Sequence, residues 1–352
     1  MSGAGVRPCG EFARSYAEDE RVLRTRFVRG AVVAGVLGLA LLPLAAGAYL
    51  LAIVSGILIA VVAATGLNIL TGYTGLISVG HGGFMGVGAY TAAILATAVG
   101  LPFWVTLPAA GCVAAAVGVL FGLPSFRLKH FYLAIATLAA QFILDYAFMN
   151  WEALTKGAMG ILVPRPTVFG HAVARDAEFY YLLLAAAVLA VTVSRNLFRS
   201  NVGRAFIAIR DQDLAAGIIG VHVARYKLYA FAISSFFAGT AGGLMAYYTT
   251  SVAPGSYNLS LSIDYLAMII IGGLGTPLGP ILGAAFVLVI PDVLQWVIEL
   301  LKHVVDVSYT FAALREIVFG LFIILFLIFE PEGLARFWRD FRAYWKLWPF
   351  AY

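Results

Sequence analysis

Two glycine-rich segments carry polar groups inside otherwise apolar stretches of the chain. The first spans 66–83 and reads GLNILTGYTGLISVGHGG, and the second spans 272–280 and reads GGLGTPLGP. Glycines this dense break a helix, and backbone groups freed from helical hydrogen bonds persist at membrane depth only beside protein or a water-filled cavity. Because pairs of interrupted helices often mark the central site of a transporter, the two segments predict a pathway for a polar solute.

The predicted pathway uses uncharged polar groups, which are costly to place in lipid. Its residues are Asn68, Thr71, Gly72, Thr74, Gly75, Ser78, His81, Gly272, Gly273 and Gly275. A second interpretation stays open, namely close helix packing through the small residues Gly82, Gly86 and Ala89. His81 is expected to bond the broken backbone rather than relay protons, since no carboxylate lies near it in sequence.

The residue patterns of an enzyme are missing. A phosphate-binding loop ends in Gly-Lys-Ser or Gly-Lys-Thr, and no Gly-Lys pair occurs in the chain. The five histidines are scattered without ligand spacing, and Cys9 and Cys112 suggest neither a disulfide framework nor a metal cluster. We therefore expect no catalytic residue, metal or cofactor here, so that the energy for transport must come from elsewhere.

The elements that position these segments are membrane helices. Of the 352 residues, 62% are hydrophobic and only 12% are charged, against about 25% charged in an ordinary soluble domain. A helix needs about 20 apolar residues to cross the hydrocarbon of a bilayer. The composition predicts an all-α, polytopic integral membrane bundle of about ten segments. They lie near 31–48, 51–69, 82–99, 103–123, 131–149, 179–194, 228–248, 262–274, 278–298 and 311–329.

Basic residues predict the orientation of this bundle. With a cytosolic N-terminus, all but five of the 23 lysines and arginines fall on the cytosolic side, as the positive-inside rule requires. The five exceptions are Lys156, Arg165, Arg175, Lys302 and Arg315. We expect a cytosolic tail at 1–29, a transmembrane domain at 30–329 and a cytosolic tail at 330–352. The last tail mixes tryptophan and tyrosine with basic residues, which is typical of an interfacial anchor on lipid.

The longest cytosolic loop, 194–227, combines charged residues with regularly spaced isoleucine and leucine. This pattern predicts a short helix over 203–220, with Ala216 and Gly220 one turn apart on a face that another surface can approach. The pattern fits a helix lying against a partner protein and a helix lying on the anionic inner leaflet equally well.

Several motifs resemble the branched-chain amino-acid permease family of ATP-binding-cassette (ABC) importers, its M-type subunit in particular. They are TGYTGLISVGHG at 71–82, FYLAIATL at 131–138, GRAF at 203–206, AIR at 208–210, RYK at 225–227, GGLGTPLGP at 272–280 and PEGL at 331–334. The loop is also similar to the Glu-Ala-Ala-x-x-x-Gly coupling motif of such importers. Ala215, Ala216 and Gly220 match it, whereas Leu214 stands at the acidic position and Asp213 comes one residue earlier.

This resemblance implies a permease subunit in a bacterial or archaeal cytoplasmic membrane. Its expected partners are a second related permease, two cytosolic ATPase subunits that bind ATP and magnesium, and an extracytoplasmic solute-binding protein, with no nucleic acid. The region 201–220 would couple to the ATPases through a set of small and charged residues. These are Gly203, Arg204, Arg210, Asp211, Asp213, Ala215, Ala216 and Gly220.

Two alternatives remain at this point. Members of the family also carry urea or short amides, so the resemblance is less specific for the substrate than for the class of protein. An ion-coupled secondary transporter would place charged residues at mid-membrane. The charged candidates here all fall near predicted helix ends, namely Asp145, Asp264, Asp292, Glu299, Arg315 and Glu316.

Overall fold

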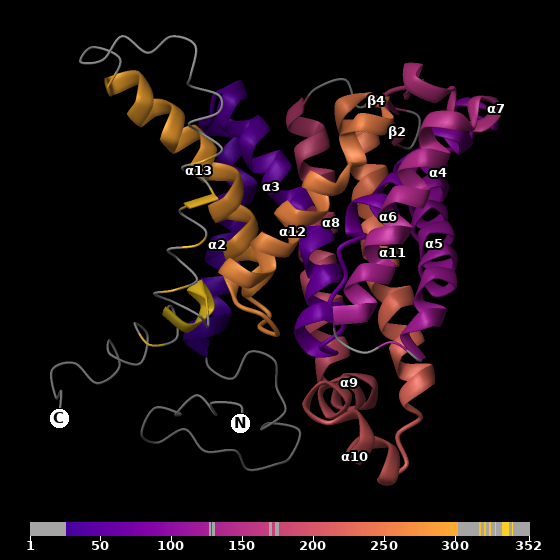
Figure 1. Cartoon of the computed structure of the whole chain (residues 1–352). Helices are drawn as coiled ribbons and strands as arrows, with labels where there is room; N and C mark the ends of the chain where they lie inside the picture. Colours follow the sequence, from indigo (N-terminus) through magenta and orange to yellow (C-terminus); the bar gives the residue numbers. More distant parts are fainter. Residues whose placement is uncertain are drawn as a thin grey trace, which may run out of the picture. The chain divides into compact units, whose positions relative to one another are not determined.

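The computed structural model describes residues 26–126, 128, 131–168, 171–172, 176–301, 317, 320–321, 324, 328, 333–337 and 340. The chain separates into two compact units, Met1–Leu51 and Ala52–Tyr352. Most of both predicted tails and most of the predicted segment 311–329 lie outside the described residues. The first unit contains helix α2 (Arg26–Ala45) and the beginning of helix α3 (Ala48–Leu67), which continues into the second unit (Figure 1).

The second unit is helical with small pieces of strand. Its long helices are α4 (His81–Thr97), α5 (Phe103–Gly122), α6 (Phe131–Asn150), α8 (Asp176–Arg199), α11 (Val223–Thr249), α12 (Leu259–Gly272) and α13 (Gly279–Leu301). Its short helices are the π-helix η1 (Asn68–Tyr73), the 3-10 helices η2 (Leu123–Phe126), η3 (Gly157–Met159) and η4 (Pro254–Tyr257), and α7 (Glu152–Thr155), α9 (Asn201–Asp211) and α10 (Asp213–Ile218). Its strands are β1 (Ile161–Leu162), β2 (Thr167–Val168), β3 (His171–Ala172) and β4 (Ser251–Val252).

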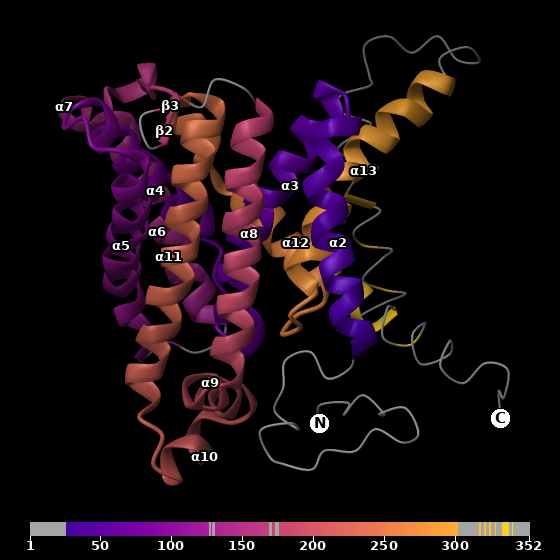
Figure 2. The same cartoon turned by 180° about the vertical axis from the view of Figure 1, so that it is seen from behind.

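Helix α11 packs most extensively against α5 and α4, and Figures 1 and 2 show it alongside both. Small residues allow this contact, because a Cβ atom on Gly88 of α4 would collide with the backbone of Gly239 in α11. A Cβ atom on Gly242 would likewise collide with the carbonyl oxygen of Met85. The two backbones therefore touch, which is how helices associate in lipid without a hydrophobic driving force.

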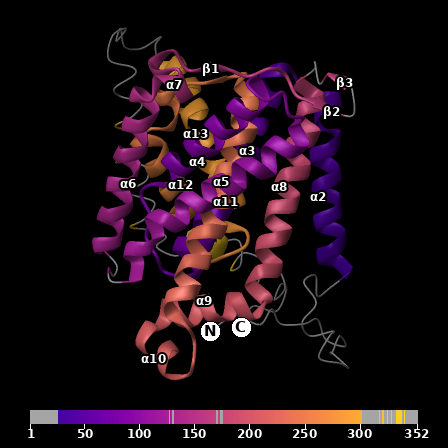
Figure 3. The ribbon, with the colours of Figure 1, turned by 90° about the vertical axis from the view of Figure 1, so that its right-hand side faces the viewer.

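The two ends of the second unit carry different elements. At one end, β1 pairs antiparallel with β4, with Ile161 opposite Val252, and β2 pairs antiparallel with β3. At the other end, α9 and α10 extend beyond the long helices, as Figures 1 and 3 show. The predicted cytosolic loop is therefore helical and lies at the end opposite to the strands.

Helices occupy every predicted membrane segment up to 278–298, which confirms the all-α class. Five helical stretches of the described residues are long and apolar enough to cross a membrane by length and composition: Ala48–Tyr73, Phe103–Ser125, Phe131–Asn150, Asp176–Arg199 and Val223–Thr249. Helices α4 and α12 are shorter, with 17 and 14 residues. The count of ten crossings stays a prediction.

Candidate functional site

The first glycine-rich segment interrupts the helix, as predicted. Helix α3 widens into the π-helix η1, and residues 74–80 are not helical before α4 begins at His81. We call residues 68–80 the first break. Two hydroxyl groups of the predicted pathway form hydrogen bonds within the break. Thr71 Oγ1 donates to the carbonyl of Leu76 at 3.1 Å, and Thr74 Oγ1 donates to the carbonyl of Ile69 at 3.0 Å. They satisfy carbonyl groups that the interruption of the helix releases.

His81 ties the start of α4 to α3. Its Nε2 atom lies 2.9 Å from the carbonyl oxygen of Ala63, and the side chain is buried. A carbonyl oxygen can only accept a hydrogen bond, so the proton sits on Nε2. This contact agrees with the expected structural role of His81. Ser78, also buried, has a hydroxyl group with no hydrogen-bond partner among the described residues.

Side chains from α6 and α12 satisfy the first amide groups of α4. The N–H of Gly82 donates to Ser262 Oγ at 2.8 Å, and the N–H of Gly83 donates to Gln141 Oε1 at 2.6 Å. Gln141 Oε1 also accepts from Ser262 Oγ, and Gln141 Nε2 donates to the carbonyl of Tyr257. Our sequence interpretation missed Gln141 and Ser262, although each is a polar residue within a predicted apolar span.

The second glycine-rich segment separates α12 from α13. We call residues 273–278 the second break, because α12 ends at Gly272 and α13 begins at Gly279. Gly273 and Gly275 have φ angles of +112° and +69°, which favour glycine. A Cβ atom on Gly272 would collide with the carbonyl of Gly279, so the helix ends fold tightly upon each other.

Asn68 joins the two breaks. Its Nδ2 atom donates to the carbonyl of Thr276 at 3.0 Å, and its Oδ1 atom accepts from the N–H of Gly275 at 2.9 Å. A Cβ atom on Gly72 would collide with Asn68 Oδ1 and the nitrogen of Gly275. Segments more than 200 residues apart in sequence therefore meet at one buried amide, and Gly72 has to be a glycine for them to do so.

The loop predicted to be cytosolic forms two helices rather than the single helix expected over 203–220. Gln212 is extended, with φ −162° and ψ 101°, and divides α9 from α10. The interpretation of Gly220 as part of a helix face was wrong. Helix α10 ends at Ile218, and Gly220 follows in a left-handed turn with φ +93°. Ala216 is buried, whereas Ala215 is exposed.

Helices α9 and α10 make different contacts. In α9, Gly203 donates its N–H to the N-cap residue Ser200, and exposed Arg204 bonds its sequence neighbours Arg199 and Asn201. In α10, Asp213 forms an ion pair of 3.6 Å with Lys227 of α11, whose side chain is only 7% exposed.

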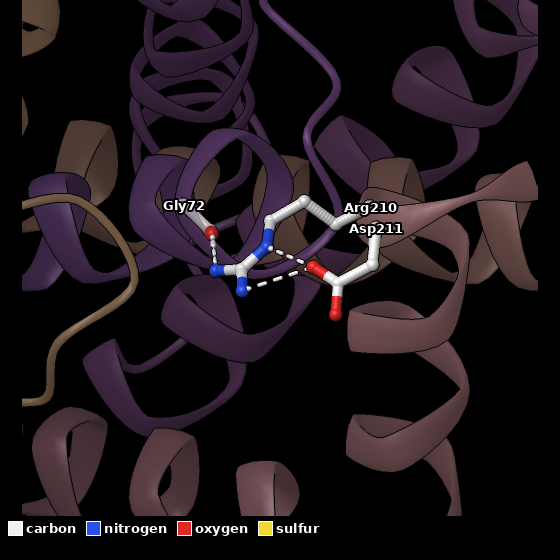
Figure 4. A network of polar contacts seen from close by, with 3 residues as sticks. All are labelled: Gly72, Arg210 and Asp211. Atoms are coloured by element: carbon white, nitrogen blue, oxygen red, sulfur yellow. Dashed lines mark hydrogen bonds and ion pairs between the residues drawn. The ribbon is translucent and has the colours of Figure 1, made fainter. Parts of the chain in front are cut away.

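Arg210, at the end of α9, reaches the first break. Its Nη1 atom donates to the carbonyl oxygen of Gly72 at 3.1 Å, while its Nε and Nη2 atoms bond Oδ1 of Asp211 (Figure 4). The structure thus brings predicted coupling residues and predicted pathway residues into direct contact.

Apolar helices with paired breaks, together with helices extending from one end, define a polytopic helical membrane protein of the transporter class. The chain belongs to the family described as branched-chain amino acid transport system / permease component, whose model matches residues 49–327. It is therefore a membrane transport component rather than an enzyme.

The relatives support this assignment. The high-affinity branched-chain amino acid transport system permease protein LivM of Escherichia coli is 34% identical over 306 residues, which cover 80% of this chain and 69% of the relative. The probable branched-chain amino acid transport permease protein LivM of Methanocaldococcus jannaschii is 26% identical over 220 residues, covering 62% of this chain and 64% of the relative. No solved structure shows significant similarity to the chain.

Proposed function

We propose that the chain is the M-type permease subunit of an ABC importer for branched-chain amino acids. It would work with a second permease subunit, two cytosolic ATPase subunits and an extracytoplasmic binding protein. Its membrane is the cytoplasmic membrane of a bacterium or archaeon, with both termini in the cytosol. The observation that carries this proposal is the meeting of two helix breaks at Asn68, in a chain whose family consists of permease components.

The pathway in this proposal follows the two breaks. Ser78 brings a hydroxyl group, and Gly72, Gly273 and Gly275 bring backbone groups without a bulky side chain. The amide of Asn68 holds the two breaks together. These groups carry no fixed charge, which suits a zwitterionic solute whose own charges balance. The side chains of Thr71, Thr74 and His81 would stabilise the backbone that forms the pathway, because their polar atoms bond backbone carbonyl groups.

Reconstitution into liposomes tests the function. We expect uptake of radiolabelled leucine to require ATP, the ATPase subunits and the binding protein, and to be indifferent to proton and sodium gradients. Gradient-driven uptake by the chain alone would contradict the proposal. Competition by excess isoleucine, but not by excess urea, would support an amino-acid substrate, and the reverse pattern would favour the amide alternative.

Helix α10 provides the proposed contact with an ATPase subunit. Leu214, Ile218 and Ile219 are 66%, 87% and 76% exposed at the end of the unit that is expected to face the cytosol. Exposed apolar side chains that cluster on a surface mark an interaction site. An ATPase groove that covers them would gain about 1.5–3 kcal/mol for each fully buried side chain.

We expect the double substitution Leu214→Ser and Ile218→Ser to weaken association with the ATPase subunits at least about tenfold, because two apolar side chains no longer leave water on binding. The stability of the isolated chain should not change, since both residues are exposed. Affinity measured on the purified proteins checks this. Leu162→Ser is the matched control, because Leu162 is 80% exposed in β1 at the opposite end. Equal losses in the double variant and the control would contradict the assignment of α10.

A further inference from the structure

The guanidinium of Arg210 divides its donors between two acceptors. Nε and Nη2 lie 3.3 and 3.2 Å from Oδ1 of Asp211, and Nη1 lies 3.1 Å from the carbonyl oxygen of Gly72. Since the guanidinium is a rigid planar fork, bonds on one edge fix the direction of the remaining donor. Figure 4 shows this arrangement, in which Asp211 holds the fork and Nη1 points at Gly72.

The acceptor belongs to the most irregular part of the first break. Gly72 lies in the π-helix η1, whose last carbonyl groups have no further helical turn to donate to them. Bonds from an ionised donor are roughly twice as strong as neutral ones. The stem of Arg210 also packs on this backbone, because a Cβ atom on Gly75 would lie only 2.9 Å from Arg210 Cγ.

The same guanidinium lies close to the second break. A Cβ atom on Gly275 would lie 2.8 Å from the carbonyl oxygen of Gly72 and 3.0 Å from Arg210 Nη1. Gly275 therefore lies against both ends of the Arg210–Gly72 hydrogen bond, and its own N–H binds Asn68. One side chain of α9 thus reaches two segments of the pathway that are far apart in sequence.

Helices α9 and α10 have different attachments. Helix α10 is tied to α11 through Asp213 and Lys227. Helix α9 contacts α11 through the rings of Phe206 and Tyr226, and it is tied to the first break through Arg210. The extended residue Gln212 joins the two helices. A force applied at α10 by a partner would reach α11 directly, and it would reach the breaks through the end of α9.

We propose that Arg210 is a positioning residue that latches α9 to both helix breaks and transmits movement of the cytosolic helices to the pathway. This inference rests on the proposed function, since it names the contact through which ATP-driven movement of the ATPase subunits would reach the pathway. Loss of the latch would leave ATP hydrolysis running while fewer solute molecules cross per ATP.

The contact itself is tested on the isolated chain by hydrogen exchange. We expect Arg210→Ala to speed amide exchange about tenfold in the segments 72–80 and 273–279, with no change in α5, because a charge-assisted bond at the breaks is lost. Arg225→Ala is the matched control. Arg225 is exposed at the start of α11 and forms no hydrogen bond or ion pair with the described residues. Unchanged exchange at the breaks in Arg210→Ala would overturn the latch.

Transmission is tested in the complete complex by measuring solute uptake and ATP hydrolysis together. We expect Arg210→Ala to lower the number of molecules taken up per ATP about tenfold and to keep at least about half of the hydrolysis rate, whereas Arg225→Ala changes neither. Arg210→Lys, which keeps one charged donor but not the fork, should fall between them. A merely structural role would lower both rates in parallel and leave their ratio intact.

The outcomes separate the two proposals. A wild-type complex that shows no ATP-dependent uptake would contradict the proposed function before any variant is compared. A wild-type complex that transports, with equal uptake per ATP in Arg210→Ala and Arg225→Ala, would overturn the latch alone.

Discussion

Replacing Gly88 by valine is expected to lower the free energy of unfolding by about 3 kcal/mol and to abolish transport. Gly88 of α4 faces Gly239 of α11, and any Cβ atom at position 88 would collide with three backbone atoms of Gly239. Backbone cannot rotate out of the way as a side chain can, so α4 would have to move away from α11. That movement would also displace the start of α4, where Gln141 and Ser262 satisfy the first amide groups.

Gly56→Val is the control for this substitution. Gly56 lies in helix α3, and a Cβ atom there would meet nothing within 4 Å. Both variants introduce the same β-branched side chain into a helix, so the difference between them isolates the loss of close packing. Unfolding in mixed detergent micelles measures the stability of each. A Gly88→Val protein as stable as Gly56→Val would show that α4 and α11 do not touch as described.

Replacing Asn68 by leucine is expected to cost about 1–3 kcal/mol of stability and to reduce uptake at least about tenfold. Leucine is similar in size but cannot bond either Thr276 or Gly275. The N–H of Gly275 and the carbonyl of Thr276 would then lose their partner, and the two breaks would separate. Asn68→Asp should be impaired as well, because a carboxylate accepts from Gly275 but has no donor for Thr276.

Asn150→Leu is the control for Asn68. Asn150 is exposed at the end of α6, and among the described residues its amide bonds the carbonyl of Tyr146 one turn earlier. Uptake by the reconstituted complex and unfolding of the isolated chain measure both variants. If Asn68→Leu and Asn150→Leu behave alike, the amide of Asn68 does not hold the breaks together.

Sequence reasoning located the helices and both breaks because the relevant physics is local. Long apolar stretches must form helices in lipid to satisfy their backbone groups, whatever packs around them. Dense glycine at 72–75 and at 272–275 interrupts such a helix on local grounds alone. Membership of the permease family follows from motifs that recur in order along the chain, which also need no coordinates.

Sequence reasoning was less accurate where a residue depends on its neighbours. Thr71 and Thr74 are predicted to line a pathway, and the sequence did not indicate that their hydroxyl groups bond the backbone of the break in which they lie. Gly220 was expected on a helix face, but α10 ends before it because Gly220 takes a left-handed conformation. Composition does not distinguish a polar side chain that faces a solute from one that satisfies the hydrogen bonds of irregular backbone.

The sequence by itself determined that this chain is a helical membrane permease component with two interrupted helices. Only the tertiary structure decided that Asn68 bridges the breaks and that Arg210 points inward at Gly72. Both contacts join residues more than 130 positions apart, so no periodicity or spacing encodes them. They exist because glycines at 72, 75 and 275 leave room for backbone, amide and guanidinium to meet, and that room appears only when the helices pack.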